Sequence, residues 1–359
     1  MLYSLCTAEC CIGPETPLFP LKHLHFHTPR WSQVSDVTAL AESTQVVILS
    51  YMRSGTSFLG KIFDVNTDAL YVFEPLWKVC EHIVPSFAKL RFLNGSVVDP
   101  GTSCEDIGQS IIRSFLTCNL LNIDQSTLTQ FWMAHGRKTI KLLNCIERSS
   151  ITTCVYRFIE VCRQSNVRIL KTIRARLERT LSTLEMLPHV KVIHLVRDPR
   201  AIISSRRLMG EYYHRNLLAT GSGICGDMRR DIHTFKNLPQ EFQGRILQIR
   251  YEDLSADPVH MAEFIYSYLR LEMPTNVVTW IKNNTHSKAD DGKPLGTLRA
   301  DSRKTASKWR ERISWSTVKS MERACQDVLE DLGYVLTSSE DTLRNLSISL
   351  TKERKLLTR

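Results

Sequence analysis

Residues 53–58 have the sequence Arg-Ser-Gly-Thr-Ser-Phe and combine a guanidinium group, three hydroxyl groups and a glycine within six positions. An uninterrupted apolar run, 46–49, precedes them, and a helix extending to about Asp64 is predicted to follow. Such a turn between a strand and a helix N-terminus binds anions, because backbone N–H groups and the helix dipole both favour negative charge there. The sequence therefore predicts an anion-binding loop. Its residues are Arg53, Ser54, Gly55, Thr56, Ser57 and Phe58.

The same loop partly matches the nucleotide-triphosphate motif G-x-x-x-x-G-K-[ST]. Residues 55–61 fit the first seven positions, but the eighth is Ile62, which has no hydroxyl group to hold Mg²⁺. A phosphosulfate suits this loop better than a triphosphate, and we expect no metal ion. A P-loop nucleotide kinase stays an alternative, as does a tight turn that binds nothing.

A second strand-to-helix junction also carries anion-binding groups. Residues 190–196 are predicted to form a strand, Arg197 ends it, and Ser205 lies eight residues further on, two turns into the predicted helix. That spacing can place a guanidinium group and a hydroxyl group on one phosphate. Asp198 as N-cap and Pro199 at the first helical position explain the turn, but they explain neither Arg197 nor Ser205.

Charged side chains follow two further predicted strands. Glu74 comes directly after the strand 69–73, and Lys171 and Arg174 lie at the end of a later strand. Open α/β folds bind ligands at the carboxyl ends of their strands, where a carboxylate can act as general base and cations can stabilise transferring charge. Two other roles stay open: Glu74 caps a helix or pairs with Arg53, and the cations belong to an ordinary solvated surface.

The composition is that of a globular protein. The chain has 359 residues, 43% of them hydrophobic, which excludes the disordered, collagen-like and coiled-coil classes. Its net charge of +10 favours an anionic ligand or an acidic polymer, but no zinc-finger spacing or RNA-binding motif occurs, so we expect no nucleic-acid partner. Eleven cysteines without a C-x-x-C pair suit a secretory lumen, as do the sequons at Asn94, Asn283 and Asn345. The cysteine pairing cannot be deduced from the sequence.

Apolar strands alternate with helices along the chain, which indicates one α/β domain with a central parallel sheet and helices on both faces. We expect this domain to span residues 41–335. Residues 1–40 contain four prolines and are expected to be a lead-in or stem, and residues 336–359 a solvated basic tail. A glycine-rich loop is expected at 220–223.

The two anion-binding junctions resemble the donor site of sulfotransferases, which use 3′-phosphoadenosine 5′-phosphosulfate (PAPS). Residues 53–58 are similar to the 5′-phosphosulfate loop of the carbohydrate 6-O-sulfotransferases, and Val-Arg-Asp-Pro-Arg-Ala at 196–201, followed by Ser-Ser-Arg, resembles the 3′-phosphate site. Phe-Glu-Pro-Leu-Trp at 73–77 resembles a segment of the same family. The resemblance covers most of the predicted domain and implies a P-loop-like, three-layer α/β fold. It is specific at the two donor motifs and weaker in the acceptor region.

The resemblance also implies roles in the donor site. Arg197 and Ser205 would bind the 3′-phosphate of PAPS. A later loop, 296–310, is similar to the segment that closes over this phosphate in sulfotransferases. It contains Arg299 and Arg303, of which we favour Arg299.

For the transfer itself, the resemblance makes Glu74 the general base. Lys171 and Arg53 would stabilise the charge of the transferring sulfuryl group. Soluble sulfotransferases have a Leu-Lys-Thr-His segment with a histidine base, and here Ile173 occupies the histidine position. This departure moves the role of the base to a carboxylate such as Glu74.

The implied reaction transfers a sulfuryl group from PAPS to a sugar hydroxyl, the 6-hydroxyl of N-acetylglucosamine, galactose or N-acetylgalactosamine. The acceptor would be a glycan on a glycoprotein, a glycolipid or a glycosaminoglycan. A catalytically inactive PAPS-binding protein is a further alternative.

Members of this family are usually Golgi type II membrane proteins, so the resemblance implies the Golgi lumen. The sequence has no run of 18 apolar residues, and we expect a truncated sequence, an alternative start or a divergent isoform. Membrane attachment is expected only if an anchor is missing.

Overall fold

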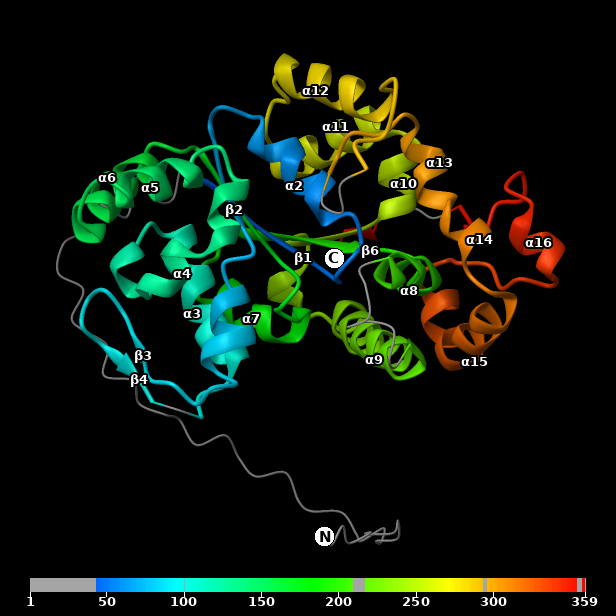
Figure 1. Ribbon diagram of the computed structural model, residues 1–359, viewed down its shortest axis with the longest axis horizontal. Helices are drawn as coiled ribbons and strands as arrows, with labels where there is room; N and C mark the ends of the chain where they lie inside the picture. The colour runs from blue at the N-terminus through cyan, green and yellow to red at the C-terminus, as the bar shows by residue number, and fades with distance from the viewer. Residues whose placement is uncertain (1–42, 100, 209–216, 293–295, 354–356, 359) are drawn as a thin grey trace, which may run out of the picture. The chain divides into compact units, whose positions relative to one another are not determined.

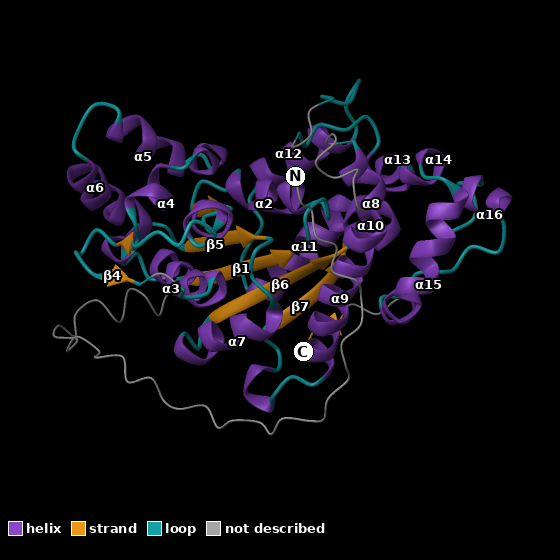
Figure 2. Cartoon of the chain, turned by 60° about the horizontal axis from the view of Figure 1, so that its bottom comes forward, coloured by secondary structure: helices purple, strands orange, loops and turns teal. Residues whose placement is uncertain are grey.

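The computed structural model describes residues 43–99, 101–208, 217–292, 296–353 and 357–358. A six-stranded sheet with the order β2-β5-β1-β6-β7-β8 forms its centre (Figure 1; Figure 2). The strands are β1 Thr44–Ser50, β2 Ala69–Phe73, β5 Val167–Thr172, β6 Val190–Val196, β7 Ile246–Arg250 and β8 Leu357–Thr358. The first five are parallel to their neighbours, and β8 pairs antiparallel with β7. The α/β class and the central parallel sheet are thus confirmed, with one short antiparallel strand at the edge.

Side chains alternate between the two faces of the sheet, and each face packs against its own helices. Val47 and Leu49 of β1 join the core formed with α3, α6 and α7, whereas Val46 and Ile48 join the core formed with α2, α11 and α12. This alternation buries both faces of β1 and gives the three expected layers. The helices have these bounds: α2 Thr56–Asp64, α3 Cys104–Leu116, α6 Ile151–Arg163, α7 Leu177–Met186, α11 Pro258–Leu269 and α12 Thr275–Thr285.

Shorter elements and a C-terminal group of helices complete the described part of the chain. The short strands are β3 Leu90–Arg91 and β4 Val97–Val98. The further helices are α4 Gln125–Thr129, α5 Thr139–Ile146, α8 Pro199–Arg207, α9 Leu217–Lys236, α10 Tyr251–Ala256, α13 Ser302–Ser307, α14 Trp309–Arg312, α15 Trp315–Asp331 and α16 Glu340–Arg344. The helical turns are the π-helical η1 Val79–Ile83 and the 3₁₀ turns η2 Leu120–Asn122, η3 Phe131–His135 and η5 Gln240–Phe242.

The expected glycine-rich loop at 220–223 is wrong, because these residues lie inside α9. Helix α9 packs beside α15 (Figure 1). A Cβ atom at Gly221 would overlap the sulfur of Met321, so this glycine allows the close approach of the two helices. Its role is packing rather than turning the chain.

Residues after 335 differ from the solvated tail that the sequence predicts. Leu343 of α16 and Leu350 are buried, and the guanidinium group of Arg310 donates to the carbonyl groups of Leu343 and Ile348 at 2.8 Å. The strand β8 then pairs with β7. Part of the predicted tail therefore packs on the α/β unit. The domain boundaries at 41 and 335 stay predictions, and the stem predicted for residues 1–40 lies outside the described residues.

All eight cysteines in the described part of the chain form disulfides. The pairs are Cys80–Cys104, Cys118–Cys162, Cys145–Cys154 and Cys225–Cys325. Three of them connect elements between residues 80 and 162, and the fourth joins α9 to α15. Within the ranges described, none of the helices combines the length and the apolar character needed to span a membrane.

Candidate active site

The loop between β1 and α2 has the conformation of an anion cradle. Gly55 is the N-cap of α2 with φ 86°, a value that favours glycine, and a Cβ atom there would also overlap the ring of Tyr251. The hydroxyl oxygen of Ser54 is buried and has no hydrogen-bond partner among the described residues. Because buried polar atoms are normally paired, this orphaned hydroxyl beside the N-terminus of α2 fits an anionic group such as the phosphosulfate of PAPS.

The structure brings the second junction against this loop. Arg53 Nε donates to Ser205 Oγ at 3.0 Å, and a terminal nitrogen of Arg197 donates to the carbonyl oxygen of Arg53 at 2.8 Å. Arg197 Nε is buried without a hydrogen-bond partner in the described ranges. The two motifs, about 150 residues apart, therefore share one edge of the sheet, since β1 and β6 are parallel neighbours.

Tyr251, which was not predicted from the sequence to belong to the site, contacts both junctions. Its ring lies under the guanidinium group of Arg197, with 4.5 Å between the guanidinium carbon and the ring centroid, and it also limits the space at Gly55. Tyr251 directly follows β7, so its position at the carboxyl edge of the sheet is the signal that could have identified it.

Glu74 forms a buried ion-pair cluster with two cations. One carboxylate oxygen lies 2.6 Å from Lys171 Nζ and the other lies 2.6 Å from a terminal nitrogen of Arg174. The parallel pairing of β2 with β5, in which Phe73 faces Lys171, brings these side chains together. Glu74 thus pairs with Lys171 and Arg174, the two cations selected from the sequence. Burial lowers the pKa of Lys171 below its ordinary value, and the carboxylate of Glu74 opposes that shift.

Gly60 and Lys61, which match the triphosphate P-loop motif, have other roles in this structure. Lys61 Nζ pairs with Asp64 at 2.6 Å, near the C-terminal end of α2. A Cβ atom at Gly60 would overlap the hydroxyl group of Tyr71, so Gly60 allows close packing of α2 on β2. Neither residue is placed as a phosphate-binding P-loop requires, which counts against the kinase alternative.

Arg299 and Arg303 make contacts within their own region. Arg299 donates to Asp291 at 2.9 Å and to the carbonyl oxygen of Gly296 at 2.7 Å, and Arg303 donates to the carbonyl oxygen of Ala256 at 2.9 Å. These contacts hold Arg299 in its loop and Arg303 at the end of α10. The choice between them stays a prediction.

A buried hydrogen-bond network supports the start of the anion-binding loop. The hydroxyl group of Tyr51, the first residue after β1, donates to Asp231 at 2.7 Å and lies 3.2 Å from a ring nitrogen of His194. Asp231 also accepts from the backbone N–H of Leu177 at 2.9 Å. The network joins the loop to β6, α7 and α9 and fixes where the loop begins.

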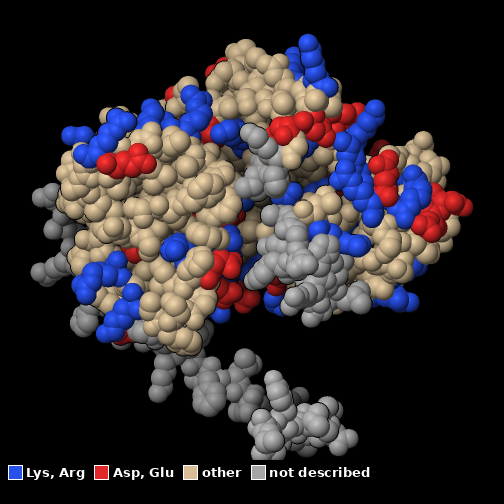
Figure 3. Space-filling model, viewed as in Figure 1, with Lys and Arg blue, Asp and Glu red and all other residues tan. Residues whose placement is uncertain are grey.

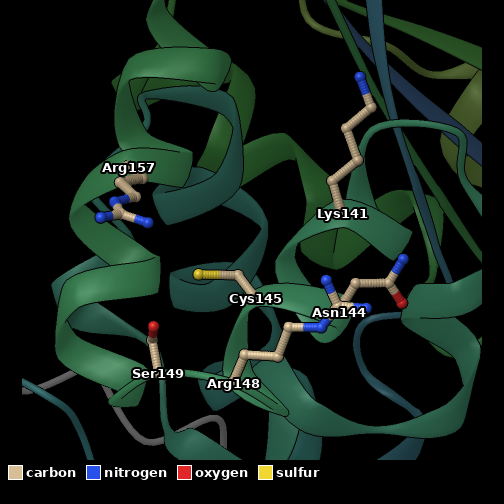
Figure 4. Close-up of a pocket in the computed structure, with 6 residues that line it drawn as sticks. All are labelled: Lys141, Asn144, Cys145, Arg148, Ser149 and Arg157. Atoms are coloured by element: carbon tan, nitrogen blue, oxygen red, sulfur yellow. The ribbon is translucent and has the colours of Figure 1, made fainter.

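A separate cavity of about 400 Å³ lies between α5 and α6 (Figure 4). It is lined by Lys141, Asn144, Cys145, Arg148, Ser149 and Arg157. None of these residues belongs to the two junctions, and the sulfur of Cys145 is in a disulfide, so the cavity offers no reactive thiol.

On the face of the molecule in Figure 3, Lys and Arg atoms gather in two places, over α5 and α6 and over α13 and α14.

Comparisons with known proteins identify relatives of this chain. The family model described as "Sulfotransferase family" matches residues 45–275. Human carbohydrate sulfotransferase 1 is 30% identical over 356 residues, covering 88% of this chain and 85% of the relative. Mouse carbohydrate sulfotransferase 3 is 26% identical, covering 86% of this chain and 72% of the relative.

Solved structures show more distant similarity. The sulfotransferase domain from the curacin biosynthetic pathway is 16% identical with a TM-score of 0.42, covering 82% of this chain and 99% of that one. A mouse sulfotransferase complexed with PAP is 12% identical with a TM-score of 0.41, covering 86% and 90%. The family match and the curated relatives span most of the described sheet and both junctions, and on that basis the chain belongs to the sulfotransferase family.

Proposed function

We propose that this protein transfers a sulfuryl group from PAPS to the 6-hydroxyl group of a sugar in a glycan, the sugar being N-acetylglucosamine, galactose or N-acetylgalactosamine. One observation carries the proposal: the hydrogen bond from Arg53 to Ser205 unites the two motifs that resemble the 5′-phosphosulfate loop and the 3′-phosphate site. The carbohydrate sulfotransferases among its relatives support a sugar acceptor.

In this proposal the residues of the two junctions hold the donor. Ser54 and the N–H groups of residues 55–57 would bind the 5′-phosphosulfate at the N-terminus of α2. Arg197 and Ser205 would bind the 3′-phosphate, helped by Arg299 or Arg303. The buried orphaned atoms Ser54 Oγ and Arg197 Nε, which lack partners within the described part of the chain, support this assignment.

The residues at the ends of β2 and β5 would carry out the transfer. The sugar hydroxyl oxygen attacks sulfur, its proton passes to Glu74, and the bond from sulfur to the bridging phosphate oxygen breaks. The products are a sulfate ester and 3′-phosphoadenosine 5′-phosphate (PAP). Lys171 and Arg53 would stabilise the negative charge that develops on the bridging oxygen and the sulfuryl group. No metal ion is needed in this scheme, because the leaving group is a stable anion.

We further propose that the enzyme acts in the Golgi lumen on glycans of glycoproteins, glycolipids or glycosaminoglycans. Four disulfides within the described residues support an oxidising compartment, because cytosolic thiols are kept reduced. The acceptor class follows the carbohydrate sulfotransferases that the chain resembles.

The test measures sulfate transfer from labelled PAPS to glycans ending in galactose, N-acetylglucosamine or N-acetylgalactosamine, with EDTA present. Glu74→Gln, which keeps the shape of the side chain, is expected to lower kcat by about 10²–10⁴-fold, as for loss of a general base. Arg197→Ala is expected to raise the KM for PAPS by about 10–100-fold, because a hydrogen bond to a charged group contributes about 1.5–3 kcal/mol. Arg207→Ala, in the same helix as Ser205, is the matched control.

Each alternative has its own outcome. Transfer that survives EDTA, with kcat lowered in the Glu74 variant and the KM for PAPS raised in Arg197→Ala, establishes the reaction and names the sugar. PAPS binding that depends on Arg197 without sulfation of any glycan would identify a non-catalytic PAPS-binding protein. Nucleotide binding that EDTA abolishes would favour the kinase instead.

A further inference from the structure

Six aromatic or imidazole rings pack together at the carboxyl end of β2, beside Glu74. Phe73 stacks on His135 with 4.7 Å between ring centroids and lies 5.4 Å from Trp132. Trp132 in turn lies 5.3 Å from Phe131 and 6.0 Å from Trp77. His82 completes the group, 4.6 Å from Trp77. The rings come from β2, from the turn after it, from η1 and from η3, so the fold gathers them at the carboxyl end of β2.

Hydrogen bonds fix this group relative to the proposed reacting residues. The side-chain nitrogen of Gln130 donates to the carbonyl oxygen of Pro75 at 2.8 Å, and its side-chain oxygen accepts from the backbone N–H of Lys78 at 3.2 Å. These bonds tie η3 to the turn that carries Glu74. Lys171 Nζ, which pairs with Glu74, lies 4.3 Å from the centroid of Phe73. The aromatic group and the ion-pair cluster are thus in direct contact.

The outer part of the group faces solvent. Phe131 is 66% exposed, and Trp132 and Trp77 are half-buried, whereas Phe73 is 4% exposed. The indole N–H of Trp132 is buried without a hydrogen-bond partner among the described residues. A group built only to fill the core would not leave the large ring of Phe131 in water against a half-buried Trp132.

We propose that Phe131, Trp132 and Trp77 form the platform against which a pyranose ring of the acceptor glycan lies, an inference that rests on the proposed function. The ring planes of Phe131 and Trp132 cross at 65° and those of Trp77 and Trp132 at 80°, so the sugar would stack on the face of one ring and be bordered by the others. The C–H groups on one face of a pyranose carry partial positive charge and are apolar, so they suit the negative face of an aromatic ring. The hydroxyl groups at the rim of the sugar stay free for polar contacts. The backbone N–H of Trp77 donates to the carbonyl oxygen of Glu74 at 3.2 Å, so a sugar ring held on the platform would lie near the residue that must accept the proton of its 6-hydroxyl group.

The platform explains how an acceptor can be oriented although the charged residues at the site serve the donor. Aromatic stacking selects a ring with a free apolar face and is tolerant of the substituent at a single carbon. We therefore expect the platform to set the affinity for the acceptor, and the ion-pair cluster to set the rate of transfer.

The experiment measures initial rates at saturating PAPS with N-acetyllactosamine as the varied acceptor, for wild type, Phe131→Ala, Trp132→Ala and Trp132→Phe. Truncation of either ring is expected to raise the acceptor KM by about tenfold and to leave the KM for PAPS within about twofold. Trp132→Phe should recover most of the loss, because it keeps an aromatic face. Tyr156→Ala removes another exposed ring, 56% exposed on α6, and should change neither constant.

A second measurement does not depend on turnover. Saturation-transfer NMR on the protein loaded with PAP detects contact with N-acetyllactosamine, and this signal should be lost in Phe131→Ala. Because Phe131 is exposed, we expect this variant to fold normally, which thermal unfolding checks. An active wild type whose acceptor KM is unchanged in Phe131→Ala and Trp132→Ala would overturn the platform and leave the proposed function standing. A wild type that sulfates no sugar would overturn the proposed function, and the NMR signal would then decide the platform alone: loss in Phe131→Ala supports it and persistence overturns it.

Discussion

Glu74 is buried between Lys171 and Arg174, at 2.6 Å from each. The two cations pair with both oxygens of this buried carboxylate and hold its direction. The arrangement makes simple truncation of a cation hard to interpret, since removing one partner of a buried pair costs about 3–5 kcal/mol and leaves a charge uncompensated. Charge-conserving substitutions are therefore the informative ones.

Lys171→Arg gives the first of these tests. Burial lowers the pKa of Lys171 below the ordinary 10.5, so the ammonium group loses its proton at a lower pH than a solvated lysine does. If Lys171 stabilises the transferring group, kcat of the wild type should fall on the alkaline side at a pH below 10.5. In Lys171→Arg this alkaline limb should disappear, because arginine stays charged, although the absolute rate should also drop.

The control for this pH profile is Lys191→Arg. Burial also lowers the pKa of Lys191, but its ammonium group donates to the carbonyl oxygen of Tyr268, away from the two junctions. The profile of this variant should match that of the wild type. An alkaline limb that survives unchanged in Lys171→Arg would assign it to another group.

At the scale of elements, two glycines of the loop and helix α2, Gly55 and Gly60, both match the triphosphate P-loop motif but have different roles in the structure. Gly55 has φ 86° and starts the helix, whereas Gly60 lies within it against Tyr71. Gly55→Ala should destabilise the protein by about 1–3 kcal/mol and weaken PAPS binding at least tenfold, because the cradle must change shape. Gly60→Ala should destabilise it by a similar amount through overpacking, with PAPS affinity changed less than about threefold.

Thermal unfolding and PAPS titration of both variants separate the two effects. The comparison is matched, since each variant adds one methyl group to the same element. Equal losses of PAPS affinity would show that Gly60 also belongs to the anion site, as in a triphosphate loop, and would count against our assignment of the donor.

Much of the element order could be predicted from the sequence. The strands expected at 69–73 and 190–196 coincide with β2 and β6, because both are short segments rich in β-branched and other bulky apolar residues. The partners of Glu74 could not be predicted, since strand order decides which neighbour it meets: β5 inserts between β2 and β1 and presents Lys171. Tyr251 and the helical position of Gly221 were missed for a similar reason, because both depend on contacts distant in sequence.

At the scale of the whole described molecule, disulfides connect helices that lie outside the central sheet. Cys225–Cys325 closes the longest loop, with a sequence separation of 100, and joins α9 to α15. Cys145–Cys154 closes a separation of 9 between α5 and α6. A cross-link stabilises mainly by restricting the unfolded chain, so the long loop should contribute more.

Two double variants test this expectation, Cys225→Ala/Cys325→Ala and Cys145→Ala/Cys154→Ala. The loop-entropy relation gives about 4.7 kcal/mol for the first pair and about 2.6 kcal/mol for the second. Urea unfolding without reductant should therefore show a free energy of unfolding about 2 kcal/mol lower for the first variant than for the second. Wild type unfolded with excess reductant, which opens all four described disulfides, should lose more than either variant. A larger loss for the short loop would mean that native packing around α5 and α6, rather than restriction of the unfolded chain, determines what these cross-links contribute.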